Sequence, residues 1–169
     1  MEPSELARFE AAMLPHLDAA HNLARYLLRD DSAAADAVQD AYLRALRHFG
    51  GWRGGDARAW LLTIVRNVCR SARAEAGVEF DETLHSGDIA DKDPAADLAR
   101  RTARETLGEA LEQLPPEFRE VIVLRELEGL SYKEIADVTG VPVGTVMSRL
   151  SRGRERLRRV LGATEGGGS

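Results

Sequence analysis

The sequence predicts an all-α protein made of two small helical domains joined by an acidic linker, with a helix-turn-helix in the C-terminal domain. Ala, Leu and Arg dominate the 169 residues whereas aromatic residues make up only 5%, so intrinsic propensity favours helix along nearly the whole chain. Apolar residues also recur at three- and four-residue intervals on both sides of a segment rich in Asp and Glu. The predicted boundaries are 1–74 for the N-terminal domain, 75–104 for the linker, 105–163 for the C-terminal domain and 164–169 for a flexible tail.

The N-terminal domain is predicted to hold about four helices. Apolar stripes at helical spacing mark the first three helices: Leu6, Phe9, Met13 and Leu17; Leu23, Leu27 and Leu28; Ala34, Val38, Tyr42 and Ala45 to Leu46. Ser32 is expected to cap the third helix. Four glycines between Phe49 and Asp56 predict a loop, after which the fourth helix runs from Ala57 to about Arg73. The polar face of that helix is expected to present Thr63, Arg66, Asn67, Arg70 and Arg73.

Charge is distributed unevenly along the chain, although the formal net charge is only -5. Gly51 to Arg73 holds five Arg against one Asp, and Ser131 to Leu161 holds seven bases against three acids, so each segment has a local charge of +4. Between them, Glu75 to Asp97 holds eight acids against one Lys, and two glycines and a proline interrupt any apolar period. This pattern predicts a solvated linker between two basic domains.

The C-terminal domain begins near Arg104 with a helix that is expected to stop at the Pro115-Pro116 pair. A second helix follows and is expected to end at Gly129. Ser131 and Glu134 then have the S-x-x-E spacing of a capping box, which satisfies free amides at the start of a helix.

A short capped helix over 132–139, a turn at Gly140 and a longer basic helix from about Val143 to Leu161 have the layout of a helix-turn-helix. One stripe of the last helix is apolar: Val146, Leu150, Leu157 and Val160 to Leu161. The opposite stripe carries hydroxyl and guanidinium groups: Thr145, Ser148, Arg149, Arg152, Arg156 and Arg159. Such groups can read base edges in the major groove or neutralise phosphates. The alternative is a solvated charged face, but it does not explain the capped helix and turn directly upstream.

Residues 111–161 closely resemble the C-terminal module of bacterial RNA polymerase sigma factors of the extracytoplasmic function (ECF) type. The segments LPPEFREV, GLSYKEIA, GVPVGTVMSRL and RGRERLR follow the order and spacing of that family. In the family, this module reads the minus-35 promoter element as duplex DNA. The resemblance implies base contacts by Thr145, Ser148, Arg149 and Arg152, and phosphate contacts near Lys133 and Arg156. Gly153 departs from the Ala often found there and is expected to loosen the helix by under about 1 kcal/mol.

Residues 9–74 resemble the N-terminal module of the same family more loosely; that module fixes on polymerase and engages the minus-10 element as it melts. The segment DAVQDAYLRAL at 36–46 is similar to the family's polymerase-binding helix. The resemblance implies contacts with the clamp helices of the largest polymerase subunit by Asp36, Gln39, Asp40 and Arg44. An ordinary amphipathic helix with outward acids is the alternative for this segment.

The family's WL..I.RN pattern recurs at residues 60–67, in the helix that follows the glycine-rich loop. A protein that captures one unpaired strand needs positive charge for the backbone and a pocket or ring face for extruded bases. The resemblance implies minus-10 contacts by Arg53, Arg58, Arg66, Asn67 and Arg70. Trp60 is expected in the core rather than as a stacking platform. Ser71 stands where many members carry Asp, which leaves promoter preference or local packing there open.

The tether is long enough to let one chain hold two promoter elements. Thirty residues reach at most about 100 Å, whereas two turns of DNA measure about 70 Å. Linking the two contacts raises avidity. We also expect the acidic tether to mask the basic faces in the free protein, so neutralising Asp88, Asp91 and Asp93 should strengthen DNA binding.

Several classes of protein are excluded by what the sequence lacks. Cys69 is the single cysteine, so neither a disulfide framework nor a four-ligand zinc motif can form, and a reducing cytoplasm fits best. No apolar run approaches the roughly 18 residues of a spanning helix. The four histidines (His16, His21, His48 and His85) fall at no metal-ligand spacing. We therefore expect no metal, no other cofactor and no enzyme activity.

The sequence thus predicts a dissociable specificity subunit that binds core RNA polymerase, selects promoter DNA and helps to open it. The alternative is a free-standing helix-turn-helix repressor or activator, which would leave the Gln39 helix and the Asn67 helix unexplained. The resemblance further implies an inhibitory anti-sigma factor as a partner.

Overall fold

The computed structural model describes residues 2–77 and 103–165, and both ranges consist of helices and turns without a strand. The predicted all-α class is therefore confirmed for the described part of the chain. The predicted linker lies almost wholly outside these ranges, as do the three Asp residues expected to mask the basic faces and tail residues 166–169.

The N-terminal half contains α1 (Pro3–Met13), α2 (Leu17–Leu28), α3 (Asp31–His48) and α4 (Ala57–Glu75), with 3₁₀ turns at Leu14–His16 and Phe49–Gly51. The sequence predicts one apolar stripe through Leu17, but the structure ends the first helix at Met13. Pro15 interrupts it because proline has no amide hydrogen to donate to the helix. Phe9 and Met13 are buried as expected, whereas Leu6 and Leu17 are exposed.

The predicted cap of α3 is wrong. Asp30, not Ser32, is the N-cap, and its carboxylate accepts hydrogen bonds from the amides of Ser32 and Ala33, both at 3.3 Å. Arg29 adopts the left-handed conformation (φ 64°) that ends α2, so the chain turns early enough for α3 to begin at Asp31. Ser32 lies inside the first turn of the helix.

The C-terminal half contains α6 (Ala103–Glu112), α7 (Pro116–Ile122), a π turn (Val123–Leu127), α8 (Tyr132–Thr139) and α9 (Val143–Glu165). The proline pair separates α6 from α7, as predicted. The last helix runs four residues beyond its predicted end at Leu161.

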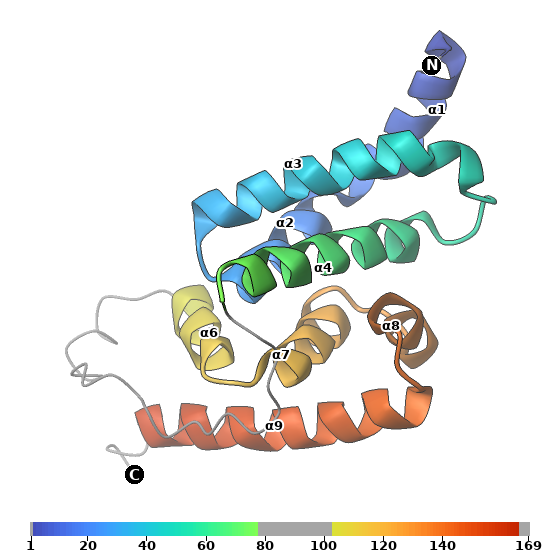
Figure 1. The fold of residues 1–169 in the computed structure, drawn as a ribbon. Helices are drawn as coiled ribbons and strands as arrows, with labels where there is room; N and C mark the ends of the chain where they lie inside the picture. The colour runs from blue at the N-terminus through green and yellow to red at the C-terminus, as the bar shows by residue number, and fades with distance from the viewer. Residues whose placement is uncertain (1, 78–102, 166–169) are drawn as a thin grey trace.

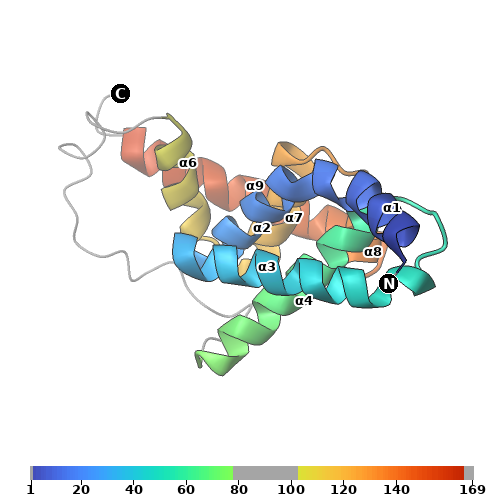
Figure 2. The ribbon, with the colours of Figure 1, turned by 90° about the horizontal axis from the view of Figure 1, so that it is seen from above.

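The two halves pack against each other as two layers. Figure 1 shows α2, α3 and α4 above α6 to α9, with α7 between α4 and α9, and Figure 2 shows α9 passing beneath the upper layer. Helix α4 packs on α8, and α2 packs on α7. The buried apolar side chains form one cluster that includes residues of both halves. The sequence predicts two domains, but it does not predict this packing.

Arg119 organises the turn between α6 and α7 from inside the protein. Its guanidinium donates hydrogen bonds to the carbonyl oxygens of Leu111 (2.8 Å), Glu112 (3.1 Å), Leu114 (2.7 Å) and, in α2, Tyr26 (3.3 Å). Burial lowers the pKa of Arg119 to about 9, which still leaves the guanidinium charged at neutral pH. The buried Arg119 side chain therefore satisfies carbonyl oxygens at the C-terminal end of α6 and links the two halves through its bond to Tyr26.

Gly153 lies where α9 makes its closest approach to α7. The residue is buried, and a Cβ there would lie 2.7 Å from Cδ1 of Ile122 and 3.3 Å from Cβ of Phe118. The expectation from the sequence was only a slightly looser helix. The structure adds a packing reason for glycine, because a methyl group at this position would force the Ile122 side chain to move and would crowd Cβ of Phe118.

Gly153→Ala should therefore lower the free energy of unfolding by about 1 kcal/mol, because overpacking outweighs the gain in helix propensity. The measurement is urea unfolding followed by circular dichroism. Ile122→Val removes Cδ1, so in that background Gly153→Ala should be neutral or stabilising. An equal effect in both backgrounds would contradict the close contact.

Candidate nucleic-acid interface

The helix-turn-helix has the local geometry that its sequence predicts. The Ser131 amide donates to Oε1 of Glu134 (2.8 Å), and the Glu134 amide donates to Oγ of Ser131 (3.0 Å), so the capping box is complete. Gly140 ends α8 in the left-handed conformation (φ 74°). Both features depend on the residue types within a few positions, which is why the sequence could predict them.

The face of α9 assigned to DNA is largely accessible. Val146 and Leu150 are buried and hold the helix on the core. Ser148 and Arg152 are exposed, Thr145 and Arg149 are half-buried, and Lys133 is exposed on α8. The predicted minus-35 residues are thus brought together within one small module.

Arg156 packs inward along the edge of this face. Its guanidinium carbon lies 5.1 Å from the centroid of the Phe118 ring, and its Nη1 is buried with no hydrogen-bond partner among the described residues. A hollow of about 300 Å³ beside it is lined by Phe118, Arg152, Glu155, Arg156 and Arg159. Three arginines around one hollow favour an anionic group such as a phosphate.

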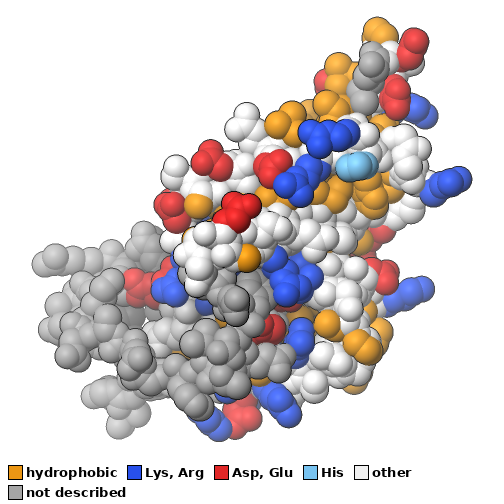
Figure 3. All heavy atoms as spheres, in the orientation of Figure 1, with side chains coloured by type: hydrophobic (Ala, Val, Ile, Leu, Met, Phe, Trp, Pro, Cys, Tyr) orange, Lys and Arg blue, Asp and Glu red, His pale blue; other side chains and the backbone are white. Residues whose placement is uncertain are grey.

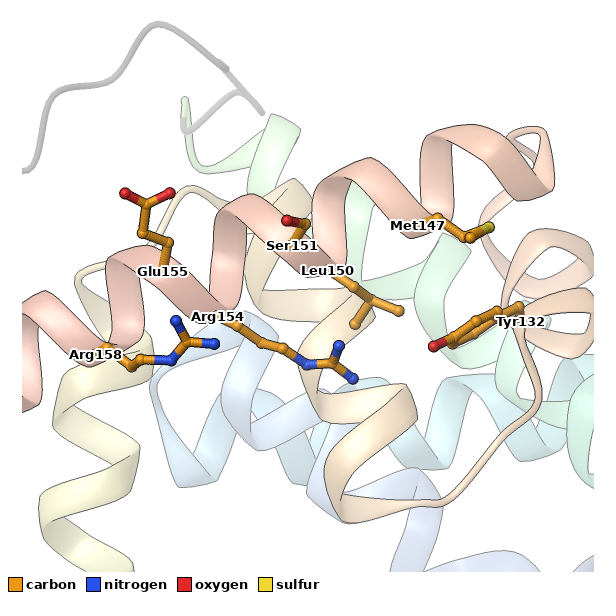
Figure 4. Close-up of a pocket in the computed structure, with 7 residues that line it drawn as sticks. All are labelled: Tyr132, Met147, Leu150, Ser151, Arg154, Glu155 and Arg158. Carbon is orange, nitrogen blue, oxygen red and sulfur yellow. The ribbon is translucent and has the colours of Figure 1, made fainter.

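The opposite face of α9 has a different character. Figure 4 shows Arg154 extending from α9 toward Tyr132 of α8, with Met147 and Arg158 also on this face. Arg154 pairs with Glu126 at 2.6 Å, and Met147 is 52% exposed. Arg154 and Arg158 therefore carry positive charge on the same helix but away from the predicted base-reading residues.

The predicted minus-10 residues of α4 fall into two groups. Arg53, Asn67 and Arg70 are exposed, as expected. Arg58 instead donates to the carbonyl oxygen of Glu128 (2.9 Å), and Arg66 is only 6% exposed. The expectation that Arg66 lies on an exposed polar face is wrong in this arrangement, because the C-terminal half covers that part of α4.

Arg66 forms a bidentate ion pair with Glu120 of α7. Its Nε lies 2.9 Å from Oε2 and its Nη2 lies 3.1 Å from Oε1 of a carboxylate that is fully buried. Burial raises the pKa of Glu120, while the hydrogen bonds and charge of Arg66, and then the charges of Arg70 and Arg149, act to lower it. Glu120 therefore faces basic residues of both halves. It lies within the LPPEFREV segment, but nothing in the sequence indicated that it would be buried and paired with Arg66.

Aromatic rings support the loop between α3 and α4. Phe49 stacks on Trp52 with ring centroids 5.5 Å apart, and Trp52 lies 6.3 Å from Trp60. Trp60 is half-buried against the core, in agreement with its expected packing role. These contacts hold the loop that carries Arg53.

The predicted polymerase-binding residues lie together on α3. Asp36, Gln39 and Arg44 are exposed, while Asp40 is half-buried and accepts a hydrogen bond from Nε of Arg44 (3.2 Å). Leu43 lies among them and is 54% exposed. An exposed leucine bordered by charged groups is typical of a protein-binding surface.

The one cysteine of the sequence, Cys69, is buried in the structure. Burial raises the pKa of Cys69 to about 12, so its thiol stays protonated and is a poor nucleophile. No group of His, Cys, Asp and Glu in residues 2–77 and 103–165 is placed to hold a metal ion. Among the described helices, none has the length and apolar character required to span a bilayer.

Comparison with known proteins identifies the family. Residues 13–77 match the family model of sigma-70 region 2, and residues 104–157 match that of sigma-70 region 4. The chain is 36% identical to the RNA polymerase sigma-H factor of Pseudomonas aeruginosa, over 79% of this chain and 76% of the relative. It is 35% identical to the ECF sigma factor SigM of Mycobacterium tuberculosis, over 91% and 77%. The chain belongs to the ECF family of RNA polymerase sigma factors.

This sigma factor also resembles two solved structures across both of its regions. The sigma factor RpoE from Bartonella quintana, crystallised with the anti-sigma factor NepR, superposes with a TM-score of 0.73 at 28% identity, over 91% of this chain and 96% of that chain. CnrH in complex with the cytosolic domain of CnrY superposes with a TM-score of 0.68 at 28% identity, over 92% and 88%. Sigma factors act in transcription initiation with RNA polymerase and are not enzymes.

Proposed function

We propose that this ECF sigma factor binds core RNA polymerase through α3, reads the minus-35 element as duplex DNA with α9 and captures the melted minus-10 strand with α4. The observation that carries the proposal is the combination, in one chain, of a capped helix-turn-helix with exposed Ser148 and Arg152 and a region 2 helix with exposed Asn67 and Arg70. A free-standing helix-turn-helix regulator would need only the first of these.

The proposed residues divide into three groups. Base and phosphate contacts at the minus-35 element come from Lys133, Thr145, Ser148, Arg149, Arg152 and Arg156; minus-10 contacts come from Arg53, Arg58, Arg66, Asn67 and Arg70; polymerase contacts come from Asp36, Gln39, Asp40 and Arg44. The arginine-lined hollow beside Arg156 supports a phosphate contact there.

The two regions must separate for this function. Helix α9 has 23 residues and is about 35 Å long, whereas two promoter elements two turns apart lie about 70 Å from each other. Figure 3 also shows Lys and Arg side chains scattered over the visible face among acidic ones rather than gathered into one basic surface. We propose that the acidic segment 75–104 acts as a tether, which lets the two regions separate when the protein binds polymerase. We propose the cytoplasm as the place where this occurs.

An anti-sigma factor is part of the proposal. Both structural relatives named above were solved in complex with a partner protein, the anti-sigma factor NepR in one of them, and each superposition covers at least nine-tenths of this chain. We propose that a protein of this kind binds the present sigma factor and controls its access to polymerase.

Transcription in vitro with purified core polymerase should depend on this protein, and start sites mapped across a genomic library should share two upstream elements. The expected result is no specific initiation by core polymerase alone. Tight binding to promoter duplex without polymerase, together with no specific initiation in its presence, would instead support the free-standing regulator.

A further inference from the structure

The contact between regions 2 and 4 centres on one buried ion pair. Arg66 of α4 holds Glu120 of α7 through two hydrogen bonds, 2.9 and 3.1 Å long, and both side chains are more than nine-tenths buried. Burying such a pair has a large desolvation cost. The pair nevertheless favours one docking geometry of the two regions, because any other geometry would leave one of the two buried charges without its partner. Arg66–Glu120 therefore specifies how the two regions dock.

Polar pairs accompany this ion pair in the contact, beside apolar side chains of both halves that belong to one buried cluster. Arg58 donates to the Glu128 carbonyl oxygen (2.9 Å), Asn22 donates to the Glu128 carboxylate (3.1 Å) and Arg29 pairs with Glu112 (3.1 Å). The polar groups of this contact can be rehydrated when the regions part, so separation leaves only its apolar part newly exposed to water. The packing is thus suited to reversible opening.

Two proposed DNA-binding arginines are occupied by this contact. Arg58 and Arg66 both bond to region 4 in the closed arrangement, whereas Asn67 and Arg70 of the same helix stay exposed. The charge of Arg149 on α9 also acts on the Glu120 carboxyl. The Glu120 carboxylate therefore interacts with a basic residue from each of the two proposed DNA-binding regions.

We propose that this sigma factor holds itself closed in the absence of polymerase, and that the buried Arg66–Glu120 pair is the lock between its two regions. Opening releases Arg66 to the minus-10 strand and leaves Glu120 beside Arg149. The consequence for DNA rests on the proposed function of α4, whereas the closed state itself does not.

The test compares the full-length protein with Glu120→Gln in the absence of polymerase. Small-angle scattering should show the radius of gyration rising by at least about 3 Å from its compact value. Affinity for a single-stranded minus-10 oligonucleotide should rise about tenfold as the open form becomes populated. Glu112→Gln is the matched control, because it removes the same charge from the exposed Arg29–Glu112 pair; it should stay as compact as the wild type and change affinity less than about twofold.

Arg66→Lys provides the reciprocal variant, since it keeps the charge but loses the two-pronged contact, and it should also expand the protein. The proposal is overturned if both variants keep wild-type helix content and remain compact. It is equally overturned if both lose helix content, because a lock between separately folded regions can be removed without unfolding either. Transcription by the wild-type protein with core polymerase is measured in parallel, so failure of the proposed function is seen independently of the scattering result.

Discussion

Arg119→Ala should lower the free energy of unfolding by about 3 to 5 kcal/mol, the largest effect expected of any single substitution considered for this protein. The guanidinium satisfies four carbonyl oxygens, and three of these hydrogen bonds are buried. Alanine leaves those oxygens without their donor and also creates a cavity.

Denaturant unfolding followed by circular dichroism measures this loss. Arg125→Ala is a suitable control, because Arg125 also belongs to region 4 but is half-buried and donates a hydrogen bond of 2.8 Å to the carbonyl oxygen of Leu130. It should cost about 1 kcal/mol. Arg119→Lys should fall between the two, since an ammonium group keeps the charge but not the planar fork. Equal losses for Arg119→Ala and Arg125→Ala would mean that the four carbonyl bonds do not act as described.

The double variant Arg149→Ala and Arg152→Ala should weaken promoter binding by the polymerase holoenzyme by about 2 to 4 kcal/mol, or about 30- to 1000-fold. Both guanidinium groups lie toward the predicted base-reading face of α9, and each good contact to a base edge is worth about 1 to 3 kcal/mol. Arg149→Ala alone should relax the choice of base at one position in the minus-35 element. Binding to promoters with systematically changed minus-35 sequences measures both effects.

The double variant Arg154→Ala and Arg158→Ala is the matched control. It removes the same charge from the same helix but from the face shown in Figure 4. Its effect should be less than about fivefold, the same for every sequence and smaller at high salt, as expected of long-range attraction to phosphates. Similar losses for the two double variants, independent of sequence, would show that α9 contacts only the DNA backbone.

The closed packing gives these variants a further use. Because Arg149 acts on Glu120, its removal also alters the surroundings of the Arg66–Glu120 pair. Scattering of the free protein therefore has to accompany the promoter measurements. A change in binding without a change in compactness belongs to the DNA contact, whereas a change in both involves the contact between the regions.

Local features were predictable from the sequence because their causes lie within a few residues. Ser131 and Glu134 bond to each other's amides, and Gly140 turns the chain, so α8 and α9 could be placed in advance. The predicted cap of α3 was wrong because Asp30 and Ser32 are both good capping residues. Only the backbone path after Arg29 decides which of them is the N-cap.

The amino-acid sequence alone determined the helical class, the helix-turn-helix and the family, because helix propensity, caps and dense motifs are short-range properties. The tertiary structure decided that Arg66 is buried rather than exposed, that Glu120 joins the two regions and that Gly153 packs closely where α7 meets α9. Each of these depends on a residue more than thirty positions away or on a helix-to-helix distance. These three features follow from how the helices pack against one another. A local sequence pattern cannot predict which surfaces will be buried together.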